Sequence, residues 1–167
     1  MGTQPDPPAS RPPNLDDLKR IGRALNAARA KYLIIGGFAV NYYGFARATE
    51  DLDLLIDSAP DNIDKIKQAL SVLPDGAAKD LTPTDFDRYS VVRVADEITV
   101  DLLTKAGDVT YDSAEAVVVN LDEVPLLIAS LSTLIATKPG VRERDQLDRA
   151  YLVRLQTEQG DRPGDAR

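Results

Sequence analysis

The sequence predicts an α+β fold in which helices flank a mixed β-sheet and a helical segment follows at the C-terminal end. Segments with helical and strand-like spacing alternate in the order α-β-α-β-α-β-β, and a turn of three residues joins the last two strands of this series as in a β-hairpin. A hairpin requires antiparallel neighbours, whereas strands separated by helices can pair in parallel. We therefore expect a mixed sheet and not a regular doubly wound α/β fold.

One domain is expected to cover most of the chain. A length of 167 residues corresponds to a single domain, and a hydrophobic content of 43% is sufficient for a packed core. Residues 1–13 contain five prolines and are expected to form a flexible leader, and the polar residues 157–167 a flexible tail. The domain itself is expected to span residues 14–156.

Each element in the first half of this domain has its own signal. Asn14 can cap a helix whose apolar residues recur at helical spacing, and Gly36-Gly37 can turn a short apolar strand into a short helix. A second strand follows, and then a helical pattern that stops at Pro74-Asp75-Gly76. The expected elements are a helix over 15–30, a strand over 32–35, a short helix ending near Gly44, a strand over 52–57 and a helix over 61–73.

The second half begins with a polar segment, residues 77–87, that is expected to be a loop. Strand-like segments on both sides of Ala95-Asp96-Glu97 predict a hairpin, and two further short apolar runs predict strands. Ser130 can cap the helix that follows them. The expected elements are strands over 89–94, 98–103, 116–121 and 124–128, and helices over 131–137 and 142–156.

Composition narrows the chemistry that is available to the chain. It has no cysteine and no histidine, which excludes disulfides, thiolate nucleophiles and every catalytic arrangement that uses histidine. Protein ligands to a metal must then be oxygen atoms, which suit Mg²⁺, Mn²⁺ or Ca²⁺. The formal net charge of −7 argues only weakly against a nucleic-acid substrate. No apolar run reaches the ~18–20 residues of a membrane span, and the first residues lack the apolar core of a secretory signal, so a cytoplasmic location is expected.

Three aspartates occupy the polar face of otherwise apolar strands. Asp51 and Asp53 are two residues apart on one expected strand and therefore point to the same side, and Asp101 has the same setting on another strand. If the two strands are neighbours, the three carboxylates converge, and such a cluster can hold two Mg²⁺ ions about 3.5–4 Å apart. The alternative is that these aspartates line a solvated face of the sheet.

Gly36 and Gly37 stand where an expected strand meets a helix. The free backbone N–H groups and the helix dipole at such a turn suit a phosphate group. The alternative is purely structural, since one glycine allows a positive φ and another allows close packing.

In this order, the motifs resemble the signature of the nucleotidyltransferase superfamily with the polymerase-β-like fold. The branch that the chain resembles is that of the small bacterial AbiEii-type nucleotidyltransferases, many of which are linked to toxin–antitoxin systems. The residues that carry the resemblance are Gly36-Gly37-x-Ala39, Gly44-x-x-Arg47-x-Thr49-x-Asp51-x-Asp53, Val100-Asp101-Leu102-Leu103, Leu134 to Lys138, and Arg142-x-x-Asp145-x-x-Asp148-x-x-x-Leu152.

The resemblance implies a reaction and a set of metal ligands. Asp51 and Asp53 would bind both metal ions, and Asp101 would bind the ion that activates the acceptor. The implied cofactor is Mg²⁺, or Mn²⁺ in its place. The implied reaction moves an NMP group from an NTP to an acceptor hydroxyl of RNA, a protein or a small molecule and releases pyrophosphate.

The resemblance also implies residues that bind the nucleotide. Gly36 and Gly37 would hold the triphosphate through their backbone, Lys138 would pair with a phosphate, and Arg47 would support the acidic site or the nucleotide. Many members of the superfamily have Gly-Ser where this chain has the two glycines, although the AbiEii-like branch includes the Gly-Gly form.

Four further residues form a second tier of candidates. Asp145 and Asp148 would orient Lys138, the nucleotide or the acceptor. Their alternative role is ion pairing along a solvated helix, where each pair contributes only about a few tenths of a kcal/mol. The four candidates are Thr49, Arg142, Asp145 and Asp148.

The leading hypothesis is therefore an active, metal-dependent nucleotidyltransferase. The alternative is a catalytically silent relative that binds a nucleotide or a toxin–antitoxin partner through the same fold. A phosphatase-like hydrolase would explain the aspartates but neither the glycine turn nor the C-terminal motif. A cognate antitoxin or toxin is a further expected partner, and no membrane partner is expected.

Overall fold

The computed structural model describes residues 9–138, 140 and 142–160, and in this part of the chain it confirms the expected α+β fold. Within the described residues, no helix combines the length and the apolar character needed to cross a membrane. In chain order the elements are α1 (Leu15–Ala27), β1 (Tyr32–Ile35), α2 (Gly36–Tyr42), β2 (Asp51–Ile56), α3 (Pro60–Leu70), the 3₁₀ helix η1 (Ala77–Asp80), α4 (Asp85–Arg88), β3 (Val91–Ala95), β4 (Thr99–Leu103), β5 (Ala116–Leu121), β6 (Val124–Ala129), α5 (Leu131–Ala136) and α6 (Glu143–Gly160).

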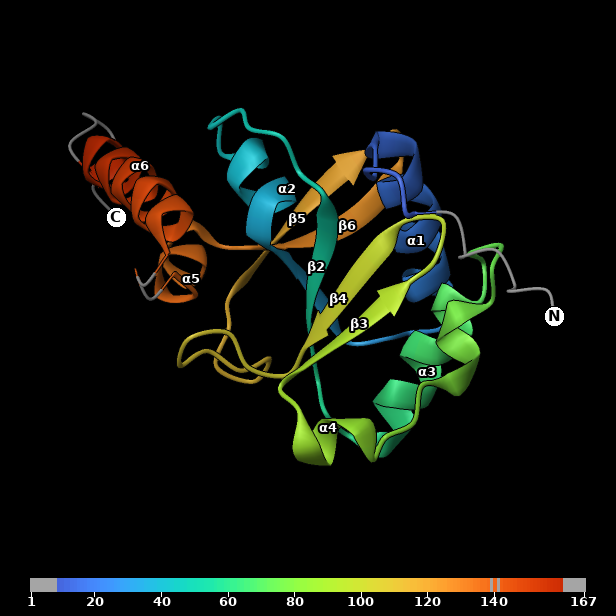
Figure 1. Ribbon diagram of the computed structural model, residues 1–167. Coiled ribbons are helices and arrows are strands. Elements are labelled where there is room, and N and C mark those ends of the chain that lie inside the picture. Colours follow the sequence, from blue (N-terminus) through green and yellow to red (C-terminus); the bar gives the residue numbers. More distant parts are fainter. Residues whose placement is uncertain (1–8, 139, 141, 161–167) are drawn as a thin grey trace, which may run out of the picture.

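A six-stranded mixed sheet with the strand order β3-β4-β2-β1-β6-β5 forms the centre of the molecule (Figure 1). The central strands combine both directions, because β1 is antiparallel to β2 but parallel to β6, and β2 is parallel to β4. The antiparallel hairpins β3–β4 and β5–β6 form the two edges. This arrangement brings β2 and β4 side by side, although α3, η1, α4 and β3 separate them in the sequence.

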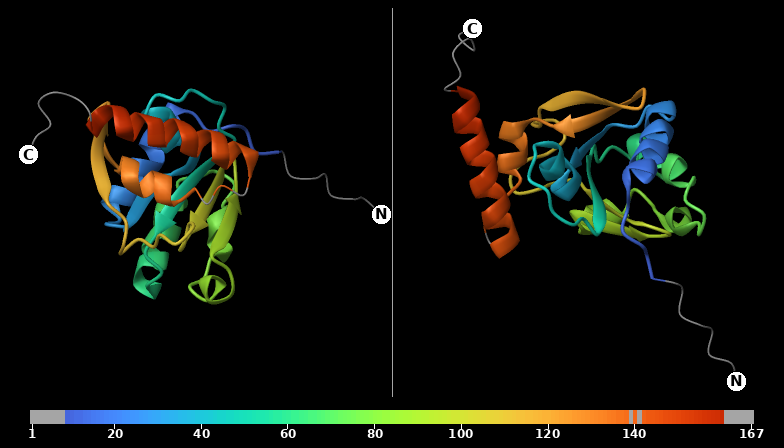
Figure 2. Two further views of the ribbon diagram at one scale, coloured as in Figure 1. Left: turned by 90° about the vertical axis from the view of Figure 1, so that its left-hand side faces the viewer. Right: turned by 90° about the horizontal axis from the view of Figure 1, so that it is seen from above.

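The helices divide between the two faces of this sheet. Helices α1 and α3 pack against each other on one face, and α2, α5 and α6 lie on the other side (Figures 1 and 2). Strand β1 is buried along its whole length, and α1 buries an apolar stripe that includes Leu18, Ile21 and Leu25. Removing this apolar surface from water, at roughly 25 cal/mol per Å², is the main source of stability. The core therefore lies on both sides of the sheet, with Ala39 and Val40 of α2 and Leu134 of α5 also buried.

Several boundaries differ from those expected. The expected loop over 77–87 contains η1 and most of α4, and its start is held by the buried Asp96, whose carboxylate accepts the backbone N–H of Asp75 and of Ala77, both at 2.9 Å. Helix α1 ends at Ala27 because Arg29 adopts a positive φ of 56°. The last helix continues to Gly160, four residues into the expected tail.

The N-terminal residues that the structure describes contact the β3–β4 hairpin. Ser10 Oγ donates to the Asp96 carbonyl at 2.7 Å, and the Arg11 backbone N–H donates to the Glu97 carbonyl at 2.9 Å. The Arg11 guanidinium also binds both oxygens of Asp17, at 2.6 and 2.8 Å, and lowers the pKa of that carboxyl. Residues 9–13 of the expected leader are therefore tied to the domain. The remainder of the leader and residues 161–167 of the expected tail lie outside the described residues.

Candidate active site

The three aspartates that were expected to converge lie on neighbouring strands. Strands β2 and β4 pair in parallel, and their register places Asp53 directly beside Asp101 and Asp51 beside Thr99. Asp101 is 8% exposed, while Asp51 and Asp53 are half-buried. All three line a cleft that is also lined by residues directly after α5 and at the start of α6. They are therefore not on an open, solvated face of the sheet.

The electrostatics of these carboxylates indicate an excess of negative charge. Burial raises the pKa of Asp53 to about 7, and the charges of Asp101 and Asp51 add to this effect. Burial and the neighbouring Asp101 also raise the pKa of Asp51. Lys138 and Arg47 lower the pKa of Asp53, but by less than burial and the two acids raise it. A cation placed among these groups would relieve the repulsion.

Arg93 of β3 belongs to this cluster and was not among the residues predicted from the sequence. Its Nε donates to Asp101 Oδ1 at 2.9 Å, and its second amino group donates to Asp101 Oδ2 at 3.1 Å and to Asp51 Oδ2 at 3.2 Å. The contact follows from the hairpin register, which places Arg93 opposite Asp101. The guanidinium therefore bridges two of the three carboxylates.

These three carboxylates, Asp51, Asp53 and Asp101, are the residues of the cleft that could hold a divalent cation. Their chemistry fits Mg²⁺ and Mn²⁺, which take carboxylate oxygen ligands. As the side chains stand, no three acidic residues in the described part of the chain are gathered closely enough to coordinate a metal ion, and Arg93 occupies oxygens of Asp51 and Asp101. Binding of a cation through these oxygens therefore requires their contacts with Arg93 to break.

Gly36 and Gly37 lie beside the carboxylates, where β1 runs into α2. Gly36 has a φ of 69°, and a Cβ at this position would collide with the carboxylate of Asp53. A Cβ on Gly37 would lie 2.5 Å from the methyl carbon of Thr49. Both structural reasons for glycine therefore apply. Gly36 also lines the cleft, where its backbone is accessible to a ligand.

Thr49 supports the loop before β2 and is not among the residues that line the cleft. It packs against Gly37, and its hydroxyl accepts a hydrogen bond from the side-chain amide of Asn41 at 3.1 Å. The same amide group of Asn41 also binds the backbone carbonyl and N–H of Arg47, at 3.2 and 3.0 Å. The loop that carries Arg47 is therefore held by α2.

A second group of charged residues, here termed the buried ion cluster, comprises Arg47, Lys138, Asp145 and Asp148. Lys138 Nζ lies 3.1 Å from Asp148 Oδ2 and 3.5 Å from Asp145 Oδ1, and an amino group of Arg47 lies 2.9 Å from the same oxygen of Asp148. Asp148 is 0% exposed and Asp145 6% exposed. The alternative of a solvated helix face is therefore wrong for both aspartates, which hold Lys138 in place. Arg142, also from the second tier, is exposed, and its Nε donates to Asp145 at 3.1 Å.

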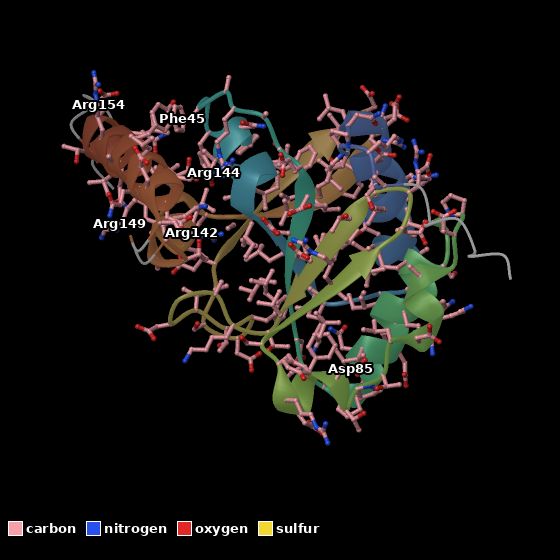
Figure 3. All side chains as sticks on the ribbon, viewed as in Figure 1. Phe45, Asp85, Arg142, Arg144, Arg149 and Arg154 are labelled. Atoms are coloured by element: carbon pink, nitrogen blue, oxygen red, sulfur yellow. The ribbon has the colours of Figure 1, made fainter. Side chains whose placement is uncertain are left out.

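A cleft of about 660 Å³ is lined by the three carboxylates, by Gly36 and by three members of the buried ion cluster, Arg47, Lys138 and Asp145. Arg142 and Arg144, labelled in Figure 3, stand at the start of α6 and line it. The chain as a whole is acidic, but the lining contains six basic residues against four acidic ones, Asp51, Asp53, Asp101 and Asp145. The basic residues of the lining are Arg47, Arg93, Lys105, Lys138, Arg142 and Arg144.

Comparisons with known proteins point to one family. A family model described as "Nucleotidyl transferase AbiEii toxin, Type IV TA system" matches residues 18–138. No curated protein matches the chain significantly. Among solved structures, the chain is similar to an antigenic nucleotidyltransferase-like protein from Paracoccidioides brasiliensis, with a TM-score of 0.52 and 17% identity over 86% of this chain and 78% of that one. At this identity the likeness concerns the fold alone.

Proposed function

The chain belongs to the AbiEii family of nucleotidyl transferases, and we propose that it moves an NMP group from a nucleoside triphosphate to an acceptor hydroxyl. The observation that carries this proposal is the pairing of Asp53 with Asp101 beside Gly36, in a cleft with a basic lining. Carboxylates suited to a divalent cation and basic groups suited to a polyphosphate share one cleft. Transfer from a nucleoside triphosphate requires this combination.

In the proposed reaction, the acceptor oxygen forms a bond to the α-phosphorus while the bond from that phosphorus to pyrophosphate breaks. The hydroxyl proton passes to the carboxylate of Asp101. Asp51, Asp53 and Asp101 would hold Mg²⁺ or Mn²⁺. When bound, such a cation neutralises charge on the phosphates and stabilises the attacking and leaving oxygens.

The basic residues of the cleft would position the triphosphate. Lys138 is oriented by Asp145 and Asp148, and its ammonium group has three donors, so it can bind a phosphate while it stays in the buried ion cluster. Arg47 reaches the same cluster and lines the cleft. Gly36 would bring its backbone close to the phosphates, and Gly37 would support it by packing against Thr49.

We also propose a cognate antitoxin as the protein partner of this chain. This follows from the family, whose description names a type IV toxin–antitoxin system. The proposed acceptor is a hydroxyl of RNA, a protein or a small molecule.

Label transfer tests the proposed reaction. The protein is incubated with each α-labelled NTP, Mg²⁺, and either total cell RNA or lysate, and the Asp51→Ala/Asp53→Ala double variant is compared with Asp64→Ala, which removes an exposed acid of α3 outside the cleft. We expect transfer by the wild type and by Asp64→Ala and none by the double variant. Mg²⁺-dependent NTP binding without transfer would instead indicate the catalytically silent alternative. Absence of both would overturn the proposal.

A further inference from the structure

Arg93 differs from the other basic residues of the cleft because its guanidinium directly contacts two of the proposed cation ligands. It donates to both oxygens of Asp101 and to one oxygen of Asp51, at 2.9 to 3.2 Å. These oxygens are the atoms that a divalent cation would use. Arg93 and the cation therefore compete for the same ligands.

The position of Arg93 allows it to be displaced. Strand β3 is an edge strand, and the side chain of Arg93 is 61% exposed, whereas those of Asp51 and Asp101 are 31% and 12% exposed. An exposed ion pair contributes little because water screens it and the long side chain loses freedom. A divalent cation at the same oxygens interacts with three carboxylates at once, so it is the stronger partner.

The displaced guanidinium has another partner within reach. Arg93 lines the same cleft as the other basic residues, and its amino groups already lie at the carboxylates where cation-bound phosphates would sit. The planar fork of a guanidinium matches two oxygens of one phosphate. Once the cation has neutralised Asp51 and Asp101, the triphosphate is the most negatively charged group near Arg93.

We propose that Arg93 exchanges partners during substrate binding: it holds Asp51 and Asp101 before the cation arrives and binds the triphosphate afterwards. The proposal rests on the proposed function because it requires a cation site and a triphosphate substrate in this cleft. It makes Arg93 a nucleotide-binding residue that also lowers the affinity of the empty site for the cation. A triphosphate then favours cation binding, because it gives Arg93 a new partner.

The exchange predicts that removing Arg93 changes cation binding and triphosphate binding in opposite directions. In Arg93→Gln, the competitor for the carboxylates is gone, so binding of the cation alone is expected to tighten by about fivefold. Binding of a triphosphate in the presence of the cation is expected to weaken by about tenfold, since a charge-assisted bidentate contact is lost. Arg93→Lys keeps the charge but not the fork and is expected to fall between the wild type and Arg93→Gln in triphosphate binding.

Mn²⁺ and inorganic tripolyphosphate are suitable probes because they do not depend on the identity of the base. Free Mn²⁺ is measured by electron paramagnetic resonance in a titration with each protein, and tripolyphosphate binding by calorimetry at saturating Mn²⁺. Arg88→Gln is the matched control, because Arg88 is an exposed arginine of α4 that does not line the cleft. It is expected to leave both affinities unchanged. Circular dichroism establishes that each variant is folded.

Each outcome separates the exchange from the proposed function. Tighter Mn²⁺ binding together with weaker tripolyphosphate binding in Arg93→Gln supports the exchange. Unchanged Mn²⁺ binding in this variant overturns the exchange and leaves the cation site intact. Weaker binding of both probes assigns Arg93 a structural role and also overturns the exchange. No Mn²⁺ binding by any of the proteins overturns the exchange and the proposed cation site together.

Discussion

The two charged groups of the cleft differ in how their charges are balanced. In the first, which comprises Asp51, Asp53 and Asp101, Arg93 pairs with Asp51 and Asp101 and is the one basic residue that does so among the described residues; its side chain is 61% exposed. In the buried ion cluster, Lys138 and Arg47 contact two acids, Asp145 and Asp148. Both acids belong to α6, which is labelled in Figure 1. One group has an excess of negative charge and access to solvent, whereas the other is balanced and buried.

This difference indicates that the carboxylates form a binding site, whereas the buried ion cluster stabilises the fold. Buried charges are tolerated when each has a partner, and removal of one partner is costly. A cluster of like charges open to solvent is instead poised to accept a counter-ion. We therefore expect changes in the carboxylates to affect ligand binding and catalysis, and changes in the buried ion cluster to affect stability first. The following predictions test this division.

The largest effect is expected for Asp53→Asn. It removes the charge of the carboxylate that lies beside Asp101 and keeps the shape of the side chain. Loss of a cation ligand at the reacting phosphate is expected to reduce nucleotidyl transfer by about 10²–10³-fold or more. Initial rates with α-labelled NTP and Mg²⁺ measure the effect, and urea denaturation is expected to show no loss of stability at pH 8. A variant that loses stability but keeps its transfer rate would contradict the division.

Asp148→Asn is expected to have the largest effect on stability. Asp148 is 0% exposed, and its carboxylate lies within 3.1 Å of cationic groups of both Lys138 and Arg47, so the variant leaves the buried Lys138 and the partly buried Arg47 without this charge. We expect a loss of about 3 kcal/mol in the free energy of unfolding, measured by urea denaturation. The matched control is Asp16→Asn, whose side chain is 88% exposed and pairs with Lys19 on the surface of α1. It is expected to change stability little. Equal losses in both variants would contradict the proposed role of the buried ion cluster in stability.

The raised pKa of Asp53 predicts how stability depends on pH. In the unfolded chain this carboxyl ionises near 3.8, but in the folded protein it ionises at about 7. Between these values the folded state retains a proton that the unfolded state has lost, so the contribution of Asp53 to stability falls as the pH rises from about 4 to 7 and then levels off. Allowing for relaxation around the cluster, we expect a loss of about 2 kcal/mol across this range.

Asp53→Asn isolates this contribution from the other acids of the chain. Its unfolding free energy, followed by urea denaturation at several pH values, is expected to fall less between pH 4 and 7 than that of the wild type. Mg²⁺ is expected to restore stability to the wild type above pH 7 and less to the variant. Parallel pH profiles of the two proteins would show that Asp53 is not the group responsible.

The carboxylate site was predictable from local spacing, but its partners were not. Alternation along a strand depends only on sequence, so Asp51 and Asp53 could be placed on one face. The pairing of Asp53 with Asp101 depends on the sheet order, which local sequence leaves open. A signal for Arg93 was present: counting across the expected hairpin turn places it on the same face as Asp101. In the structure the turn lies one residue later in the sequence, over residues 96–98, and this brings Arg93 directly opposite Asp101.

The buried ion cluster was less predictable, for a physical reason. Acids and bases three or four residues apart on a helix have the same spacing on a solvated face and on a buried one, and only the packing of α6 decides between them. The helix η1 is a similar case, because the backbone N–H groups of Asp75 and Ala77 at its start are bound by Asp96, which is distant in the sequence. The fold class and most elements of regular structure, by contrast, followed from hydrophobic periodicity and turn residues.

The smallest effect, and the most specific, is expected for glycine substitutions at the end of β1. Gly36→Ala places a methyl group against the Asp53 carboxylate at a positive φ of 69°, whereas Gly37→Ala places one against the methyl group of Thr49. Each is expected to cost about 1–2 kcal/mol of stability through strain and overpacking. Only Gly36→Ala displaces a carboxylate, so it is expected to weaken Mn²⁺ binding more than Gly37→Ala does. Equal effects on Mn²⁺ binding would mean that the two glycines act only through packing, because the contact with Asp53 is the difference between them.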